Sequence, residues 1–171
     1  MIKISTALLA TLLVSACATQ TKLPVASAVL AATTGNTVNG FVTFSKLPNG
    51  VRVAGEVRGL APNTEHGFHI HEKGDCSSGD GMGTGGHFNP TAQAHGAHAN
   101  SEHHTGDLVS LVADATGVAR FDYTSVTISV GEGATDVIGH GLIVHRDADD
   151  FKTQPTGNSG ARVACAVIVK N

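Results

Sequence analysis

The feature that most constrains the fold of this chain is a period-two alternation of apolar and charged residues, the pattern of a β-strand with one buried face. One such segment covers residues 51–58 and follows a Pro-Asn-Gly turn. Another covers residues 119–124, after a turn at 114–117, and we expect it to form a hairpin with residues 107–113. Apolar runs predict further strands at 26–32, 37–45, 139–145 and 163–169.

The composition favours one all-β domain. A chain of 171 residues with 41% hydrophobic and 15% charged residues has the size of a single globular domain. Its 21 glycines favour turns over long helices. Between His71 and Asp107 lies a long Gly-, Ser- and His-rich stretch without periodicity, and such loops in compact domains are usually functional. We therefore predict an antiparallel sandwich or barrel with one large ordered loop.

Charge and histidine content narrow the class of function. The formal net charge is -3, and the chain has neither a basic block nor aromatic residues interleaved with basic ones. This argues against a protein that binds nucleic acid. The unusual count is 10 histidines, most of them between His66 and His145, which points to metal binding.

The N-terminus has the pattern of an export signal. Lys3 precedes an apolar run from Ile4 to Val14, which is shorter than the roughly 20 residues of a membrane-spanning helix. The string LVSAC resembles a bacterial lipobox, which implies a signal peptide over 1–16, lipid on Cys17, and attachment to the outer membrane of the cell envelope. A flexible tether over 17–25 and a domain over 26–171 would follow. The alternatives are a plain secretory signal cleaved after Ala18 and an uncleaved anchor.

The cysteine count agrees with export. If Cys17 carries lipid, then Cys76 and Cys165 remain as an even pair in an oxidising compartment, and we expect them to form a disulfide. Closing that loop would stabilise the fold by roughly 4 to 5 kcal/mol on the chain-entropy model. Two free buried thiols are the alternative, which is more typical of cytosolic proteins.

The histidine spacing suggests two metals. His69 and His71 are two residues apart on an expected strand and therefore point to one face. Further histidines follow in the long loop and at the end of a later strand, and one aspartate comes after them: His87, His95, His104, His145 and Asp107. Imidazole suits copper and zinc, and three imidazoles with one carboxylate make a closed tetrahedral zinc site.

Five segments in this order resemble the copper/zinc superoxide dismutases, in particular the bacterial periplasmic or lipoprotein type: GFHIHEKGDC, GGHFNP, HTGDL, LIVHRDADD and GARVAC. The match runs from about Gly40 to the C-terminus. The resemblance implies an eight-stranded Greek-key antiparallel β-barrel with a long metal-binding loop. It also implies the family disulfide between Cys76 and Cys165.

The resemblance further implies the metal ligands. Copper would be bound by His69, His71, His87 and His145, and zinc by His87, His95, His104 and Asp107. The carboxylate of Asp149 would accept protons from His69 and His95, and Arg162 would guide the anionic substrate. Neighbours in an extended segment point opposite ways, so only one of His103 and His104 can face the metal. We choose His104 for its spacing to Asp107, with His103 as the alternative.

The activity implied is dismutation of superoxide to oxygen and hydrogen peroxide, with His87 and Arg162 as the catalytic residues. The alternative is a non-catalytic copper- and zinc-binding envelope lipoprotein that buffers or delivers metal. A purely structural adhesion module would leave the histidine spacing unexplained. The resemblance leaves both a monomer and a homodimer open.

The chain departs from the family pattern in a short stretch from His145 to Arg162 and in Ala166, where glycine is usual. We expect His66 to be structural and assign no role to His98 or His140.

Overall fold

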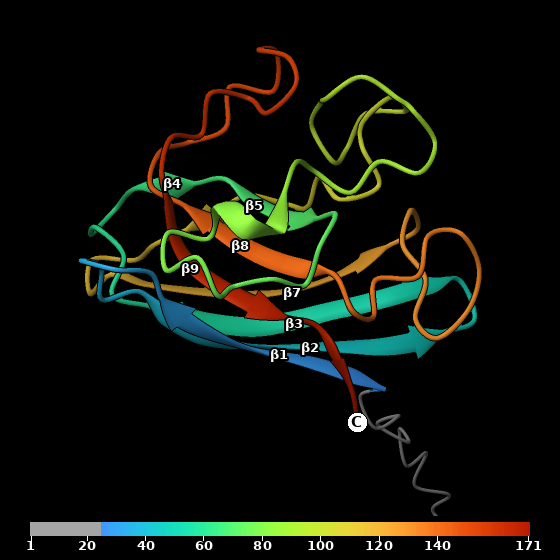
Figure 1. The fold of residues 1–171 in the computed structure, drawn as a ribbon, viewed down its shortest axis with the longest axis horizontal. Helices are drawn as coiled ribbons and strands as arrows, with labels where there is room; N and C mark the ends of the chain where they lie inside the picture. Colours follow the sequence, from blue (N-terminus) through green and yellow to red (C-terminus); the bar gives the residue numbers. More distant parts are fainter. Residues whose placement is uncertain (1–24) are drawn as a thin grey trace, which may run out of the picture.

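The computed structural model describes residues 25–171, which fold into strands joined by loops (Figure 1). Among these residues there is one short 3-10 helix, η1, and no α-helix. The elements in chain order are β1 (Ala26–Ala32), β2 (Asn39–Leu47), β3 (Gly50–Arg58), β4 (Glu65–His66), β5 (Phe68–His71), η1 (Met82–Thr84), β6 (Leu111–Val112), β7 (Val118–Ser125), β8 (Gly141–His145), β9 (Arg162–Val167) and β10 (Val169–Lys170). The all-β class is confirmed.

The predicted signal peptide and the lipidation site at Cys17 lie outside the described residues, as does nearly all of the predicted tether. Val25 is described, and its backbone N–H donates a 2.9 Å hydrogen bond to the carbonyl of Phe44. Within residues 25–171, no helix has the length and apolar character needed to cross a membrane.

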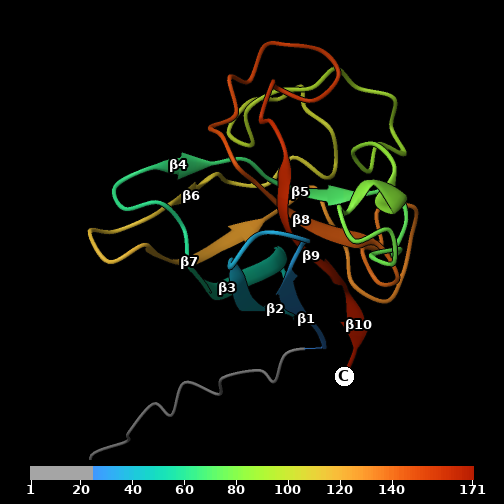
Figure 2. The ribbon, with the colours of Figure 1, turned by 60° about the vertical axis from the view of Figure 1, so that its left-hand side comes forward.

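An eight-stranded antiparallel sheet forms most of the fold, with the strand order β5-β8-β9-β1-β2-β3-β7 and β10 paired to β1. The hairpins β1–β2–β3 are sequential, whereas β8 lies between β5 and β9 after a long excursion of the chain. Figures 1 and 2 place β1, β2 and β3 on one side of the curled sheet and β5 and β8 on the other. This arrangement confirms the predicted Greek-key barrel.

Period-two alternation predicted β3 and β7 well, but it gave one wrong partner. We expected residues 107–113 to form a hairpin with 119–124. Instead β7 pairs along its whole length with β3, while β6 pairs with β4. The turn between β6 and β7 does form, since the N–H of Gly117 donates to the carbonyl of Asp114 at 3.0 Å. Alternation reports which face of a strand is buried and does not identify the strand beside it.

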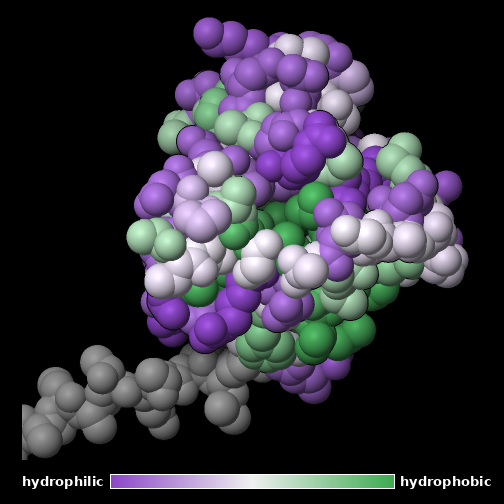
Figure 3. All heavy atoms as spheres, turned by 90° about the vertical axis from the view of Figure 1, so that its left-hand side faces the viewer, coloured by the Kyte–Doolittle hydropathy of each residue, from purple (hydrophilic) through white to green (hydrophobic). Residues whose placement is uncertain are grey.

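The apolar side chains meet inside the curled sheet. On β3, Val51, Val53 and Val57 are buried, while Arg52 and Arg58 are exposed. Figure 3 views the face that lies on the left in Figure 1, and apolar side chains gather there in a hollow among polar ones. The long loops after β5 and β8 extend from the opposite side of the molecule from β1 and β2 (Figure 1), and they carry the site described next.

Candidate metal centre

Strands β5 and β8 supply three histidines. His69 and His71 are two residues apart on β5, so they point to one face, and their ring centroids are 6.5 Å apart. β8 pairs antiparallel with β5 and ends at His145, where the register with β9 shifts. Such an irregularity re-aims a side chain. The ring centroid of His145 lies 4.8 Å from that of His69.

The long loop after β5 folds back and is held against that strand. The N–H of Ile70 donates to the carbonyl of Gly106 at 2.8 Å. A Cβ on Gly106 would lie 2.2 Å from the carbonyl oxygen of Ile70, so this approach requires glycine. Two isolated β-bridges also join strand and loop: His69 with Asp107, and His71 with His87. The loop therefore brings its own histidines to those of β5.

Seven buried side chains form two groups that share one histidine. In each group the possible ligand atoms lie within 4.8 Å of one another. The four-histidine group consists of His69, His71, His87 and His145, and the aspartate group consists of His87, His95, His104 and Asp107. The structure thus brings together every residue that the sequence suggested as a metal ligand.

Each histidine of the four-histidine group has a buried ring nitrogen with no hydrogen-bond partner among the described residues: His69 Nδ1, His71 Nε2, His87 Nε2 and His145 Nε2. The other ring nitrogen is held by the protein. His69 Nε2 donates to Asp149 Oδ2 at 2.7 Å, and His71 Nδ1 donates to the carbonyl of Gly85 at 2.9 Å. Buried polar atoms rarely lack partners, and metal-ligating histidines have their second nitrogen bonded in this way. The four free nitrogens fit a metal ion.

Three of these histidines are neutral at neutral pH. Burial lowers the pKa of His87 to about 4. Burial, followed by the neighbouring imidazoles, holds the pKa values of His71 and His145 well below the ordinary value. Neutral imidazole is the form that binds a metal, so these side chains need not lose a proton first.

Asp107 is the centre of the aspartate group. Its Oδ1 lies 2.8 Å from His87 Nδ1 and 3.3 Å from His104 Nδ1. Its Oδ2 lies 3.1 Å from His95 Nδ1 and accepts the backbone N–H groups of His104 and Gly96 at 2.8 and 3.1 Å. Burial raises the pKa of Asp107, but the hydrogen bonds from the three histidines outweigh burial and hold it well below the usual range.

Asp149 links the two groups. Its Oδ1 accepts a 2.9 Å hydrogen bond from His95 Nε2, while its Oδ2 accepts the bond from His69. Burial lowers the pKa of His95, but hydrogen bonds to Asp107 and Asp149 outweigh burial and raise it to about 9. A Cβ on residue 157 would lie 1.9 Å from Asp149 Oδ1 and clash with it. The loop can therefore pass this close to the carboxylate only because this residue is Gly157. The arrangement fits the role that the resemblance implied for Asp149.

The two donor sets suit different metals. Four imidazole nitrogens suit copper, whereas three imidazoles with a carboxylate make a closed tetrahedral zinc site. His87 presents Nε2 to the first group and Nδ1 to the second. The residues present therefore fit copper in the four-histidine group and zinc in the aspartate group.

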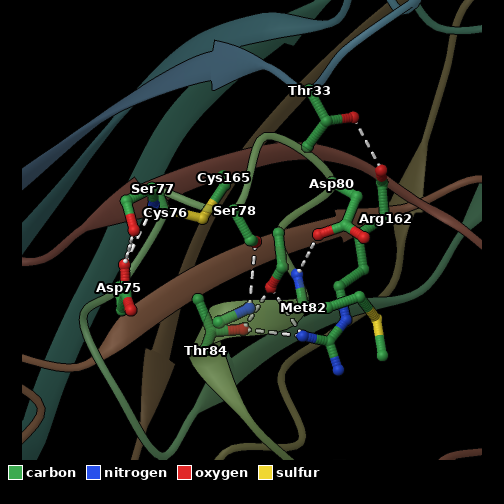
Figure 4. The surroundings of a disulfide bond; sticks show 12 residues. Thr33, Asp75, Cys76, Ser77, Ser78, Asp80, Met82, Thr84, Arg162 and Cys165 are labelled. Carbon is green, nitrogen blue, oxygen red and sulfur yellow. Dashed lines mark hydrogen bonds between the residues drawn. A yellow bond between two sulfur atoms is a disulfide. The ribbon is translucent and has the colours of Figure 1, made fainter.

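The loop after β5 also holds the guanidinium of Arg162, which begins β9 (Figure 4). Nη1 donates to the carbonyl of Gly81 at 2.7 Å and to the hydroxyl of Thr84 at 2.8 Å. Nη2 donates to the carbonyl of Gly85 at 2.6 Å. Burial lowers the pKa of Arg162, and the nearby Asp80 raises it, but an arginine stays charged in proteins.

A disulfide fastens this loop to β9. Cys76 in the loop and Cys165 on the strand are bonded, which confirms the predicted pair, and they lie 89 residues apart in the sequence. Arg162 stands three residues before Cys165 on the same strand. The disulfide therefore fixes the carbonyl groups that hold Arg162 relative to the strand that carries it (Figure 4).

The structure places His104, not the alternative His103, in the aspartate group. His103 is turned away and donates from Nδ1 to the carbonyl of His104 at 2.6 Å. The remaining histidines each donate to the backbone carbonyl of a group member: His66 to His145 at 2.9 Å, His98 to Asp107 at 2.9 Å, and His140 to His71 at 3.2 Å. These three histidines thus hold the backbone of the metal-ligand candidates. Of the three, only His66 was expected to have a structural role.

Two supporting residues had no signal in the sequence. The hydroxyl of Thr84 accepts a hydrogen bond from Arg162, which is 78 residues away in the sequence. The side chain of Gln154 accepts one from the backbone of His95, which is 59 residues away. Both lie where the sequence has no periodicity, so only the path of the folded loops reveals these contacts.

Comparison with known proteins identifies the family. The model of the family "Copper/zinc superoxide dismutase (SODC)" matches residues 38–168. The chain belongs to this family. An extracellular superoxide dismutase [Cu-Zn] of Brugia pahangi is 38% identical over 159 residues, covering 88% of this chain and 78% of that protein. A superoxide dismutase [Cu-Zn] 2 of Mesembryanthemum crystallinum is 41% identical over 140 residues, covering 78% of this chain and 88% of that protein.

Solved structures agree with this family assignment. The clock protein EA4 superposes with a TM-score of 0.78 at 40% identity, covering 86% of this chain and 96% of its own. A double mutant of a SOD-like protein from Bacillus subtilis superposes with a TM-score of 0.76 at 34% identity, covering 84% and 96%. Both solved structures thus share the barrel fold of this chain.

Proposed function

We propose that this protein is a superoxide dismutase that converts superoxide to oxygen and hydrogen peroxide. Copper would be held by His69, His71, His87 and His145, and zinc by His87, His95, His104 and Asp107. The observation that carries the proposal is the shared histidine: His87 is the one side chain common to two buried groups whose donors suit copper and zinc. Bound copper would supply the one-electron oxidation and reduction, and bound zinc would fix the orientation of His87.

The chain's own residues supply a proton site. Forming hydrogen peroxide from two superoxide ions consumes two protons. If zinc holds Nδ1, the one proton of a neutral His87 ring would sit on Nε2 whenever copper does not occupy that nitrogen, and Nε2 is buried with no hydrogen-bond partner among the described residues, so it could hold one of the two protons. Its Nδ1 is fixed by Asp107 at 2.8 Å, which keeps the ring oriented.

Arg162 supplies the anion-binding charge. Its guanidinium is half-buried and fixed by three hydrogen bonds to one loop. The chain without residues 1–16 carries 10 basic and 14 acidic residues, a net charge of -4 that repels superoxide at long range. A fixed cation in a partly desolvated place can attract an anion locally against that repulsion. Arg162 is therefore assigned to guiding and binding the substrate.

The proposal extends to location. The protein would be exported to the bacterial cell envelope, lose residues 1–16, and stay on the outer membrane through lipid on Cys17, with 17–25 as a tether to the domain over 26–171. The apolar run from Ile4 to Val14 and the LVSAC string support this. A disulfide across most of the domain supports an oxidising compartment. The relative in Brugia pahangi is named extracellular.

The deciding experiment is a superoxide decay assay on the purified, processed chain loaded with copper and zinc. We expect superoxide to disappear far faster than its spontaneous dismutation, with one copper and one zinc bound per chain. Binding of both metals without superoxide consumption would instead identify a metal-buffering lipoprotein. Binding of two equivalent zinc ions and no copper would overturn the metal assignment.

A further inference from the structure

The loop between β8 and β9 holds the backbone of His95 as well as its ring. The side-chain amide of Gln154 makes two hydrogen bonds to that one residue. The backbone N–H of His95 donates to Gln154 Oε1 at 2.8 Å, and Gln154 Nε2 donates to the carbonyl of His95 at 3.0 Å. The side-chain amide thus pairs with the backbone of His95 as the peptide group of a neighbouring strand would. It joins two loops across a separation of 59 residues in the sequence.

The loop that carries Gln154 is built to present it. The carboxylate of Asp150 accepts the backbone N–H groups of Lys152 and Thr153 at 2.9 and 2.8 Å. The N–H of Gly157 then donates to the carbonyl of Thr153 at 2.7 Å, which closes a turn around residue 154. These bonds fix the backbone beneath the amide.

His95 is consequently held at both ends. Asp149 binds Nε2 at the far side of the ring, and Gln154 binds the backbone N–H and carbonyl. Nδ1 lies on the side of the ring nearest the backbone, so a rotation of the backbone moves Nδ1 directly. With both ends fixed, Nδ1 stays 3.1 Å from Asp107 Oδ2, where the zinc of the proposed function would bind.

We infer that Gln154 is a positioning residue for zinc: its amide fixes the backbone of His95 so that Nδ1 stays in place in the aspartate group. This rests on the proposed function only for the identity of the metal. The inference predicts that the amide slows zinc release and protects the His95 backbone from exchange, without touching the metal or the substrate.

The test compares Gln154→Met, which keeps the side-chain length without hydrogen bonds, with Gln154→Asn, which keeps the amide on a shorter chain. In the processed protein loaded with copper and zinc, zinc release to a chromogenic chelator should be about 10-fold faster in both variants, as for other groups that orient metal ligands. Hydrogen exchange of the His95 amide should rise by about 10-fold, as expected when its N–H loses the acceptor Gln154 Oε1. Exchange of strand amides such as Val53 and copper content should stay unchanged.

Gln93→Met is the matched control, because Gln93 is in the same loop as His95 and its side chain makes only a 3.5 Å hydrogen bond to the nearby Thr91. It should release zinc at the wild-type rate. If Gln154→Met matched Gln93→Met in both zinc release and His95 exchange, the positioning role would be wrong. A wild-type protein that binds zinc but consumes no superoxide would overturn the proposed function and leave this result standing.

Discussion

Nη1 of Arg162 donates a 2.8 Å hydrogen bond to the hydroxyl of Thr84, a side chain with no exposed surface. That hydroxyl donates in turn to the carbonyl of Gly81 at 2.9 Å, which also accepts from Arg162. The guanidinium is therefore locked into a small closed network that the loop supplies. A cation held in this way loses little conformational freedom when it binds an anion.

Replacing Arg162 tests its proposed role in guiding superoxide. Arg162→Ala should slow superoxide consumption by about 10-fold at low ionic strength, and Arg162→Glu should slow it further, because local attraction is lost or reversed. The salt dependence of the rate should weaken, while copper and zinc contents and the visible copper spectrum stay the same. Stopped-flow decay of superoxide at several salt concentrations measures both effects.

Arg146→Ala and Lys152→Ala are the controls for this comparison. Both side chains are exposed, and Arg146 already pairs with Asp147 at 2.9 Å. Salt screens exposed charges within about 8 Å at physiological ionic strength, so their removal should change the rate less. Wild-type consumption by Arg162→Glu at low salt would exclude the guiding role, even if the metal assignment held.

Single ligand variants should separate the two metals, because His87 alone belongs to both groups. His69→Ala and His145→Ala should lose copper and superoxide consumption but retain most zinc. Asp107→Ala should lower zinc affinity by at least about 10-fold and loosen the loop, since Oδ2 also binds two backbone N–H groups. Metal analysis after dialysis measures the two contents. Equal loss of both metals in His69→Ala would contradict separate sites.

How far the sequence predicted this fold depended on which interactions are periodic. Alternation located β3 and β7 because their buried valines and exposed charges repeat every two residues. It failed for the partner of residues 107–113, since β4, which pairs with β6, has two residues and no pattern of its own. No sequence pattern therefore indicated the short strand β4.

The site divides in the same way. The metal-ligand candidates could be named because histidine is rare and the segments around these residues resemble those of one family. Gln154 and Thr84 carry polar side chains of common types in loops, and their partners His95 and Arg162 come from other parts of the chain. Nothing local marks such a residue, since its role comes from the path of two loops past each other.

Removing the disulfide should destabilise the domain and disturb Arg162. The loop closed by Cys76 and Cys165 spans 89 residues, so the chain-entropy model predicts a loss of about 4 to 5 kcal/mol in the double variant Cys76→Ser, Cys165→Ser. Denaturant unfolding with and without a reducing agent measures this. Reduced wild type should match the double variant, and equal stability of oxidised wild type and double variant would contradict the expected contribution.

Cys17→Ser tests the proposed lipid anchor. The variant should lose lipid and normal signal processing, yet keep both metals, because the described domain begins after this residue. Metabolic labelling with palmitate and mass spectrometry of the purified chain report the modification. Palmitate labelling that is the same in wild type and in Cys17→Ser would refute the lipobox interpretation and favour a plain secretory signal.

The chain's single tyrosine allows a test of how β7 packs against the long loop after β5, which carries metal-ligand candidates. The ring of Tyr123 on β7 packs 5.6 Å from that of His98, and its hydroxyl oxygen is buried. Burial raises the pKa of Tyr123 well above its ordinary value, whereas an unfolded tyrosine titrates near about 10. The folded protein thus favours the neutral phenol. This contribution to stability is complete below about pH 10 and is lost as the pH rises through the pKa of the folded state.

Ultraviolet absorbance should show no tyrosinate near pH 10 in the native protein and a full step there after denaturation. Tyr123→Phe should abolish the step, and a native titration near pH 10 would show that the loop leaves the phenol open to solvent.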